Sequence, residues 1–558
     1  MKKNIRLICF LLVAVLCFSA CGGGNVDKPI EHAEDLSGSI VLGLPVGGSE
    51  GTELQAVIDA YTDIHPNVKV TLKFVETGGY KSYLETPLSA GDISKCPFDI
   101  CMNNMARKYI DAGKFADYLQ YLTEENPYND AYDTWMDSLE ADAYIPDGSK
   151  GEVYSLNWQS TQVRFAYNKK IFEKAGVSVG DCATWDGFVR VCDKIQKAGY
   201  TPLAIGGNDY SFTGSQMCWI FNVYTDQYFR SAAETAHAQE GDFCYDASID
   251  SVWQYYATPV LTSGMSESET AEEWKKALYN DYFLNYTKNE LRLLKAIKDD
   301  ELGPVNKKYQ NMLANLAKVF PKYCLANYSS YGNDNMNSKF AKQECAITLQ
   351  QSYYVYNSWL SIAENYQPTD DNFFEIGFFD FPAMSANTDY ADLADYGPDV
   401  NYTRSYGGSM GSWAIVNKNV EQVKLCMDFM MYLTSPQAQE KYYAMARALD
   451  VCVLKGTMIK GVTIPEDLLK GFELPVLNGI ARSNPAMLFS TGLTGESYSQ
   501  TAFGSSASTL FTTTPDYNDI QEFATTMQTV IKSNMFRYLR DRRYNSNCLD
   551  NVAVSPYV

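Results

Sequence analysis

Histidine is almost absent from this sequence of 558 residues, which contains only His32, His65 and His237. A zinc or copper site built on clustered imidazoles is therefore not expected, and the sequence predicts no metal or other cofactor. A serine hydrolase is also disfavoured, because no histidine follows the Gly-x-Ser-x-Gly pattern at Gly407–Gly411. We predict instead that these glycines precede a strand at 413–416 and allow close backbone approach to a ligand or a neighbouring lobe.

Basic residues are outnumbered as well. The chain has 46 Lys and Arg against 67 Asp and Glu, a formal charge of −21. Removing the three N-terminal cations Lys2, Lys3 and Arg6 leaves −24. An acidic surface of this size repels nucleic acid and anionic lipid head groups, so neither is expected as a partner.

Long apolar runs are missing beyond the N-terminus. A basic start and an apolar stretch of 12 residues, Leu7–Phe18, precede small residues and Cys21. This is the pattern of a secretory signal, too short for a bilayer core that needs about 20 residues. Residues 1–20 are therefore predicted to be a signal peptide, and the glycine-rich 21–37 a flexible tether.

The end of this signal resembles the bacterial lipobox, in which a cysteine becomes the lipidated N-terminus. The resemblance implies a lipoprotein outside the cytoplasm, anchored to the cell membrane through a lipid such as palmitate on Cys21. A soluble secreted protein cut near the same place is the alternative.

Cysteines form no evident disulfide framework. Of 14 cysteines, Cys9 and Cys17 lie in the signal and Cys21 is the lipid site, which leaves an odd 11 without repeated spacing. The pairs Cys96–Cys101 and Cys182–Cys192 stay open. Buried free thiols are favoured, because cysteine packs as a small apolar side chain.

Aromatic residues are plentiful, with 41 Tyr and 8 Trp. Rings with an apolar face and a polar edge suit sugars, which present C–H patches on one face and hydroxyls around the rim. For any single ring, a place in the core remains the simpler expectation.

The length exceeds one ordinary core, so at least two domains are expected. The first domain opens with alternating strands and helices. The predicted elements are a strand at 39–44, a helix ending at Ile64, a strand at 68–74, a helix near 80–90 and a strand at 98–102. This order predicts a largely parallel sheet, with ligand beyond the strand C-termini near Gly47 and Gly78.

Three separated strings resemble one protein family. They are Ala60–Val70, Tyr167–Val177 with Thr184-Trp185-Asp186 after it, and Gly407-Gly408-Ser409 followed by Trp413–Lys418 and Thr434–Gln439. Together they are similar to family 1 extracellular solute-binding proteins, the maltose-binding-like lipoproteins of ABC sugar importers, over roughly residues 38–450. The resemblance implies an α/β, two-lobed periplasmic-binding-protein-like fold with a hinge and a ligand cleft between the lobes.

The resemblance also suggests how the chain divides. The expected parts are lobe 1 at 38–156, mainly lobe 2 at 157–403 with an enlarged helical stretch at 225–330, a return to lobe 1 at 404–445, and mainly lobe 2 helices at 446–558. Within lobe 2, Thr184 is predicted to cap a helix that buries Trp185 and ends at Gly199.

The implied function is that of an extracytoplasmic protein that binds a carbohydrate, an oligosaccharide by preference, and delivers it to the permease subunits of an ABC importer by cleft closure. We expect a monomer and no enzyme activity. Two alternatives stay open. One is a surface glycan-processing enzyme, since 67 Asp and Glu offer many carboxylate pairs. The other is a sensor domain for a membrane kinase.

The resemblance also implies aromatic candidates for the ligand site. Trp158 stands where the chain of the family passes between lobes, so it is expected to stack on a sugar ring, with plain packing as the alternative. Trp413 begins a strand and is expected to contact ligand or the other lobe. Tyr353 and Tyr354 stand where maltose-binding-like proteins carry a stacking tryptophan.

Polar candidates complete the set. Gln351 is expected to hydrogen-bond sugar hydroxyls beside the two tyrosines. Asn208 and Asp209 follow a predicted strand and offer several polarised hydrogen bonds, although a simple turn would use the same residues.

Overall fold

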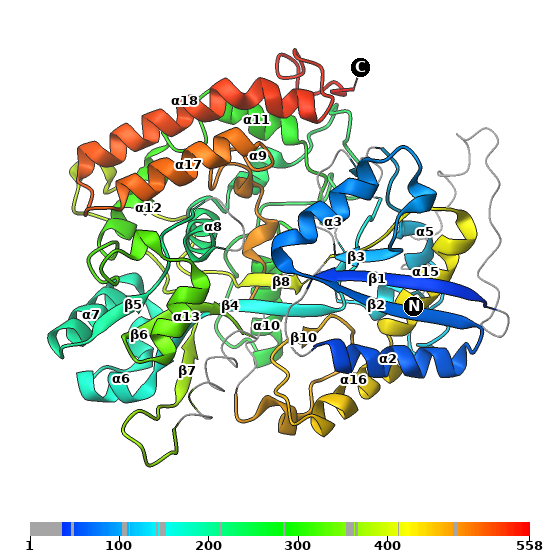
Figure 1. The fold of residues 1–558 in the computed structure, drawn as a ribbon. Helices are drawn as coiled ribbons and strands as arrows, with labels where there is room; N and C mark the ends of the chain where they lie inside the picture. Colours follow the sequence, from blue (N-terminus) through cyan, green and yellow to red (C-terminus); the bar gives the residue numbers. More distant parts are fainter. Residues whose placement is uncertain are drawn as a thin grey trace.

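The computed structural model shows two lobes, each built on its own β-sheet (Figure 1). It describes residues 36–45, 50–102, 109–110, 112–140, 143–144, 152–210, 215–282, 285–352, 362, 366–410, 412–472 and 478–557. The predicted signal peptide, Cys21, Gly47, Tyr353 and Tyr354 lie outside the described residues.

The sheet of lobe 1 has the strand order β2-β1-β3-β9. Its strands are β1 (Gly38–Pro45), β2 (Val68–Val75), β3 (Ile100–Met102) and β9 (Trp413–Ile415). β1 runs parallel to β2 and β3, as predicted for strands joined by helices, whereas β9 is antiparallel to β3. The helices of this lobe are α2 (Glu50–Ile64), α3 (Thr77–Ser89), α5 (Leu119–Leu122), α15 (Val420–Leu433) and α16 (Pro436–Ala448).

The sheet of lobe 2 is organised around one long strand, β4 (Gln159–Asn168). Its other strands are β5 (Thr201–Ala204), β6 (Cys345–Gln351), β7 (Ile376–Phe379), β8 (Tyr406–Met410) and β10 (Gly456–Thr457). β6, β7, β8 and β10 all pair antiparallel with β4, and β5 pairs parallel with β6. The run that matches the hydrolase pattern thus forms a strand itself, not a strand–turn–helix elbow.

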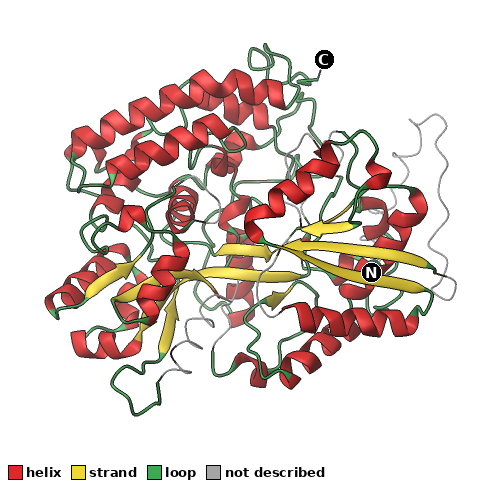
Figure 2. Ribbon diagram, viewed as in Figure 1, coloured by secondary structure: helices red, strands yellow, loops and turns green. Residues whose placement is uncertain are grey.

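Helices make up most of the remaining mass of lobe 2 (Figure 2). They are α6 (Lys169–Ala175), α7 (Trp185–Lys197), α8 (Gln216–Tyr228), α9 (Ala232–Ala236), α10 (Glu267–Leu278), α11 (Glu290–Lys298), α12 (Lys307–Ala317), α13 (Asn333–Ala341), α17 (Ser497–Leu510) and α18 (Tyr517–Asp541). α17 and α18 lie side by side as a long hairpin along one edge of the lobe (Figure 1).

The sequence determines α7 in detail. The Thr184 hydroxyl accepts a hydrogen bond from the backbone N–H of Gly187, 3.2 Å away, and so satisfies a donor that the helix itself leaves unpaired. Trp185 is buried in the lobe 2 core, as its spacing predicts. Gly199, with φ +90°, turns the chain after the last helical residue.

Each lobe has its own apolar core. In lobe 1, buried residues of β1, α2 and α15 pack together, among them Leu42, Val57 and Phe429. Met458 and Ile459, which follow β10, are buried in this same core. In lobe 2, the helical stretch at 225–330 and α18 share one core with β4 and α7. Each fully buried apolar side chain contributes about 1.5–3 kcal/mol.

The 11 cysteines of the described chain are free thiols, and most are buried, which agrees with the reading of the sequence. Cys96, Cys101, Cys182 and Cys192 are all unpaired and buried. Within the part of the chain that the structure describes, no helix is both long and apolar enough to cross a membrane.

Candidate ligand cleft

Three segments of the described chain pass between the two sheets, next to one another. In the first, Leu156 forms a β-bridge with Trp413 of lobe 1, and three residues later the chain enters β4 of lobe 2. In the second, β8 ends at Met410 in the sheet of lobe 2, shortly before β9 begins in the sheet of lobe 1. In the third, β10 pairs with β4, and Met458 directly after it donates a backbone hydrogen bond to Trp158 O at 3.0 Å. These segments form the hinge between the lobes.

Gly407 of β8 is needed for this arrangement. Gly407 has φ +154°, and a Cβ atom there would lie 2.2 Å from the carbonyl oxygen of Thr161 in β4. A side chain would therefore push the two strands apart. The close approach that the sequence suggested is thus an approach to β4 in the same sheet.

Aromatic side chains gather where the hinge meets lobe 1. The rings of Trp158 and Trp413 are perpendicular, with centroids 6.1 Å apart, and Tyr442 of α16 packs against Trp158 at 5.5 Å. A cavity of about 30 Å³ lies beside them. It is lined by Leu44, Pro45, Leu54, Phe74, Met102, Trp158, Gln159 and Trp413.

This cavity lies at the carboxyl ends of the parallel strands β1, β2 and β3, the edge at which open α/β sheets bind ligands. Its volume is enough for a water molecule but far below the 300–1,000 Å³ or so of a small-molecule site. A ligand as large as a sugar therefore does not fit inside this cavity.

The ring of Phe74 differs from the two tryptophans in exposure. Trp158 and Trp413 are each 4 % exposed, whereas Phe74, near the end of β2, is 44 % exposed. The sequence indicated Phe74 only as part of an alternating strand. Its place next to the C-terminal end of a parallel strand is the signal that could have identified it, because that edge is where ligands bind.

The polar candidates lie on lobe 2. Gln351 ends β6 opposite Val163 of β4 and is half-buried. Asn208 follows β5, is exposed, and donates its backbone N–H to Tyr331 O at 3.3 Å. Asp209 lies near Cys218 of α8. Burial of the Cys218 thiol raises its pKa to about 12, and the negative charge of Asp209 makes a smaller contribution in the same direction.

The structure thus brings together some of the predicted site residues but not all of them. Trp158 and Trp413 are in contact on the lobe 1 side. Gly78 lies in the first turn of α3, directly after β2. Among the described residues, no hydrogen bond joins Asn208 or Gln351 to the tryptophans.

A buried ionic cluster anchors the chain just before β8. The Arg404 guanidinium is fully buried and donates to Asp226 at 3.0 Å and to Asp281 at 2.9 Å. Burial acts to raise the pKa of Asp281, but the positive charges of Arg404 and Arg230 outweigh it and lower the pKa to about 2. The cluster ties α8, the end of α10 and the start of the second hinge segment together.

Lys455 lies next to the third hinge segment, immediately before β10. Burial lowers the pKa of its ammonium group to about 7. A side chain that takes up a proton near neutral pH is therefore placed beside the strands that join the lobes.

The model of the family of bacterial extracellular solute-binding proteins matches residues 47–440. The chain belongs to this family. The members of this family are extracellular binding proteins, which places the protein outside the cytoplasm. A search of curated proteins finds no match to the chain.

Solved structures agree with this assignment at the level of the fold. A structure from work on xylan utilization by the thermophilic bacterium Caldanaerobius polysaccharolyticus aligns with a TM-score of 0.54 and 14% identity, covering 88% of this chain and 100% of that one. A chitin oligosaccharide binding protein aligns with a TM-score of 0.51 and 14% identity, over 89% and 98% of the two chains. A family 1 extracellular solute-binding protein from Bifidobacterium longum subsp. infantis aligns with a TM-score of 0.50 and 14% identity, covering 88% of this chain and 99% of that one.

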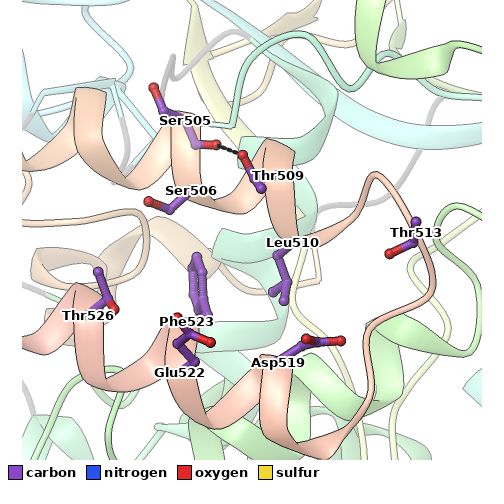
Figure 3. Close-up of a pocket in the computed structure, with 9 residues that line it drawn as sticks. All are labelled: Ser505, Ser506, Thr509, Leu510, Thr513, Asp519, Glu522, Phe523 and Thr526. Atoms are coloured by element: carbon purple, nitrogen blue, oxygen red, sulfur yellow. Dashed lines mark hydrogen bonds between the residues drawn. The ribbon is translucent and has the colours of Figure 1, made fainter.

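A larger hollow of about 430 Å³ lies elsewhere on this solute-binding protein, between α17 and α18 (Figure 3). Hydroxyl side chains dominate its lining, with Phe523 and Leu510 between them, and the Thr509 hydroxyl donates to Ser505 O of its own helix at 3.0 Å. Both walls belong to one helical hairpin of lobe 2. Movement of one lobe against the other cannot close such a groove, so we place the candidate site at the hinge.

Proposed function

We propose that this solute-binding protein binds a carbohydrate, an oligosaccharide by preference, between its lobes and delivers it to the permease subunits of an ABC importer. The observation that carries the proposal is the aromatic wall at the hinge: Trp158 and Trp413 support a surface from which Phe74 projects. Rings of this kind stack on the C–H faces of sugars. Two structures with the same fold come from proteins or studies named for chitin oligosaccharides and xylan.

The proposed binding step uses both lobes. Phe74 stacks on one sugar face from lobe 1, and Asn208, Asp209 and Gln351 supply hydrogen bonds to hydroxyls from lobe 2. Tyr353 and Tyr354 are proposed as further stacking residues of that lobe. Ligand drives closure only through contacts that exist in the closed state and not in the open one. The importer then recognises the closed form.

Delivery to a membrane partner requires that the protein stay near the membrane. We propose that the protein is a monomer anchored through a lipid on Cys21, with residues 21–37 as the tether. Over about 17 residues, a flexible chain has a root-mean-square length of about 20–25 Å. The lobes thus remain within reach of a permease in the same membrane.

A thermal-shift screen of the purified chain against mono- and oligosaccharides, including xylo- and chito-oligosaccharides, tests the proposal. A ligand that binds only the folded state stabilises it by about 2.7 kcal/mol at a hundredfold excess over its dissociation constant. A saccharide that raises the melting temperature and is recovered intact supports binding without catalysis. Cleaved saccharide would replace the proposal by a glycan-processing enzyme, and a screen without any shift would remove the carbohydrate assignment. If the protein binds a sugar that the cells do not take up, and binding instead activates a membrane kinase, the sensor alternative would be favoured.

A further inference from the structure

The last turns of α18 concentrate positive charge on an otherwise acidic molecule. Five cations and one carboxylate lie between residues 532 and 543, whereas the whole chain has 46 Lys and Arg against 67 Asp and Glu. A helix C-terminus favours cations through its dipole, so charge by itself implies no partner. The side chains around these cations add a second feature.

Two strongly exposed rings accompany the charge. Tyr498 in the first turn of α17 is 65 % exposed, and Phe536 on α18 is 60 % exposed. The Arg537 guanidinium lies 4.2 Å from the centroid of Tyr498 and 5.7 Å from that of Phe536. These cation–π contacts hold the three side chains in one arrangement across two helices.

Two of the five cations, Arg537 and Arg540, are available to a partner, whereas Lys532 and Arg542 pair with Asp300 and Glu290. Arg537 makes no ion pair with any residue in the described part of the chain. Arg540 pairs with its neighbour Asp541 at 3.1 Å, but the two side chains are 69% and 59% exposed, and such a pair contributes little. Arg540 follows Phe536 by four residues and Arg537 by three, so it neighbours both side chains on the surface of α18.

We propose that Tyr498, Phe536, Arg537 and Arg540 form a docking surface, the basic aromatic patch, for a protein that presents acidic side chains. Tyrosine, phenylalanine and arginine are enriched at the centres of protein interfaces, and the charge is complementary to carboxylates. Anionic lipid is less suited, because the formal charge of −21 repels it at longer range. The identity of the partner rests on the proposed function: it is the extracytoplasmic face of the importer's membrane subunits.

The patch is separate from the candidate ligand cleft. It belongs to the α17–α18 hairpin of lobe 2, whereas the aromatic wall of the cleft packs into the core of lobe 1. Docking and ligand binding are therefore expected to be separable by mutation.

Site-specific photo-crosslinking in cells that produce the full chain tests the patch. Benzoylphenylalanine replaces Phe536, and in the matched control it replaces Val260, which is also 60 % exposed. We expect light-dependent crosslinks from position 536, but not from 260, to a membrane protein at a peptide that contains Asp or Glu. Arg537→Glu should reduce the crosslink yield at least tenfold. Arg190→Glu, at an exposed arginine on α7 of the same lobe, should leave it unchanged.

Any of four results would overturn the proposal. They are equal crosslinking from both positions, crosslinks to lipid alone, no crosslink, and an unchanged yield with Arg537→Glu. Thermal shifts with saccharide on the same variants keep it apart from the proposed function. If the chain with benzoylphenylalanine at position 536 binds sugar but does not crosslink, the patch alone is removed. If that chain crosslinks but binds no sugar, the proposed function is removed and an acidic protein partner is left to be identified from the crosslinked peptide.

Discussion

The ring of Trp158 meets the ring of Trp413 edge to face, 6.1 Å between centroids, and this contact joins two of the segments that connect the lobes. The third segment is attached to the same point, because the backbone N–H of Met458 donates to Trp158 O at 3.0 Å. The wall of the candidate cleft and its hinge are therefore one packed unit. Changes in this unit should affect stability, whereas changes on its exposed side should affect binding.

Replacing Trp158 by alanine should destabilise the protein strongly. The ring is 4 % exposed and packs against both Trp413 and Tyr442, so its loss leaves a cavity, for which we expect a cost of about 3–5 kcal/mol in the free energy of unfolding. Urea unfolding measures this cost. Trp158→Phe should cost less, and a midpoint equal to wild type in Trp158→Ala would contradict the packing role.

Replacing Phe74 by alanine should weaken ligand binding instead. With the ring 44 % exposed, we expect little change in unfolding but at least a tenfold loss of affinity, about 1.4 kcal/mol, for any saccharide found by the thermal-shift screen. Calorimetric titration measures the affinity. Tyr396→Ala, at a ring that is also 44 % exposed, is the matched control. Equal affinities of both variants and wild type would exclude Phe74 from the site.

Replacing Arg404 by methionine should remove the main counter-charge of two buried carboxylates. We expect a loss of about 3–5 kcal/mol in the free energy of unfolding, because two buried negative charges, Asp226 and Asp281, then share the single buried cation Arg230. Arg447→Met removes an exposed pair with Asp467 and should cost at most about 1 kcal/mol. Adding Asp281→Asn to Arg404→Met leaves Arg230 and Asp226 as a pair of opposite charges and should restore part of the loss, and no recovery would argue against a charge effect.

The low pKa of Lys455 makes stability depend on pH. Burial lowers this pKa from 10.5 to about 7, so between these values the unfolded chain holds a proton that the folded chain has released. Stability therefore rises with pH through this window and levels off above it. The melting temperatures of wild type and Lys455→Met are measured at intervals from pH 6 to 10.5. The difference between them at each pH isolates this contribution. A difference that is constant with pH would contradict the shift.

Local features of the fold could be predicted from the sequence. The Thr184 cap, the parallel arrangement of β1 to β3 and the helix Val420–Leu433 all depend on neighbouring residues, whose spacing is visible in the chain. The pairing of β4 with four strands from distant parts of the chain could not be predicted, because register between distant strands leaves no local pattern.

The same distinction holds for the sites. Trp158 and Trp413 could be selected from the family resemblance, but their contact depends on the hinge, and their burial separates them in role from Phe74. The basic residues near 540 are visible in the sequence. Their alignment with Tyr498 requires the α17–α18 hairpin and becomes apparent only in three dimensions.

The buried free thiols make the opening of each lobe measurable by chemical labelling. Cys101 and Cys426 are buried in lobe 1, and Cys182 and Cys345 in lobe 2, with burial holding each of these pKa values far above neutral pH. A maleimide can react with them only after a local or global opening exposes the sulfur. The alkylation rate of each cysteine, followed by mass spectrometry, therefore reports how often its own lobe opens, without any engineered label.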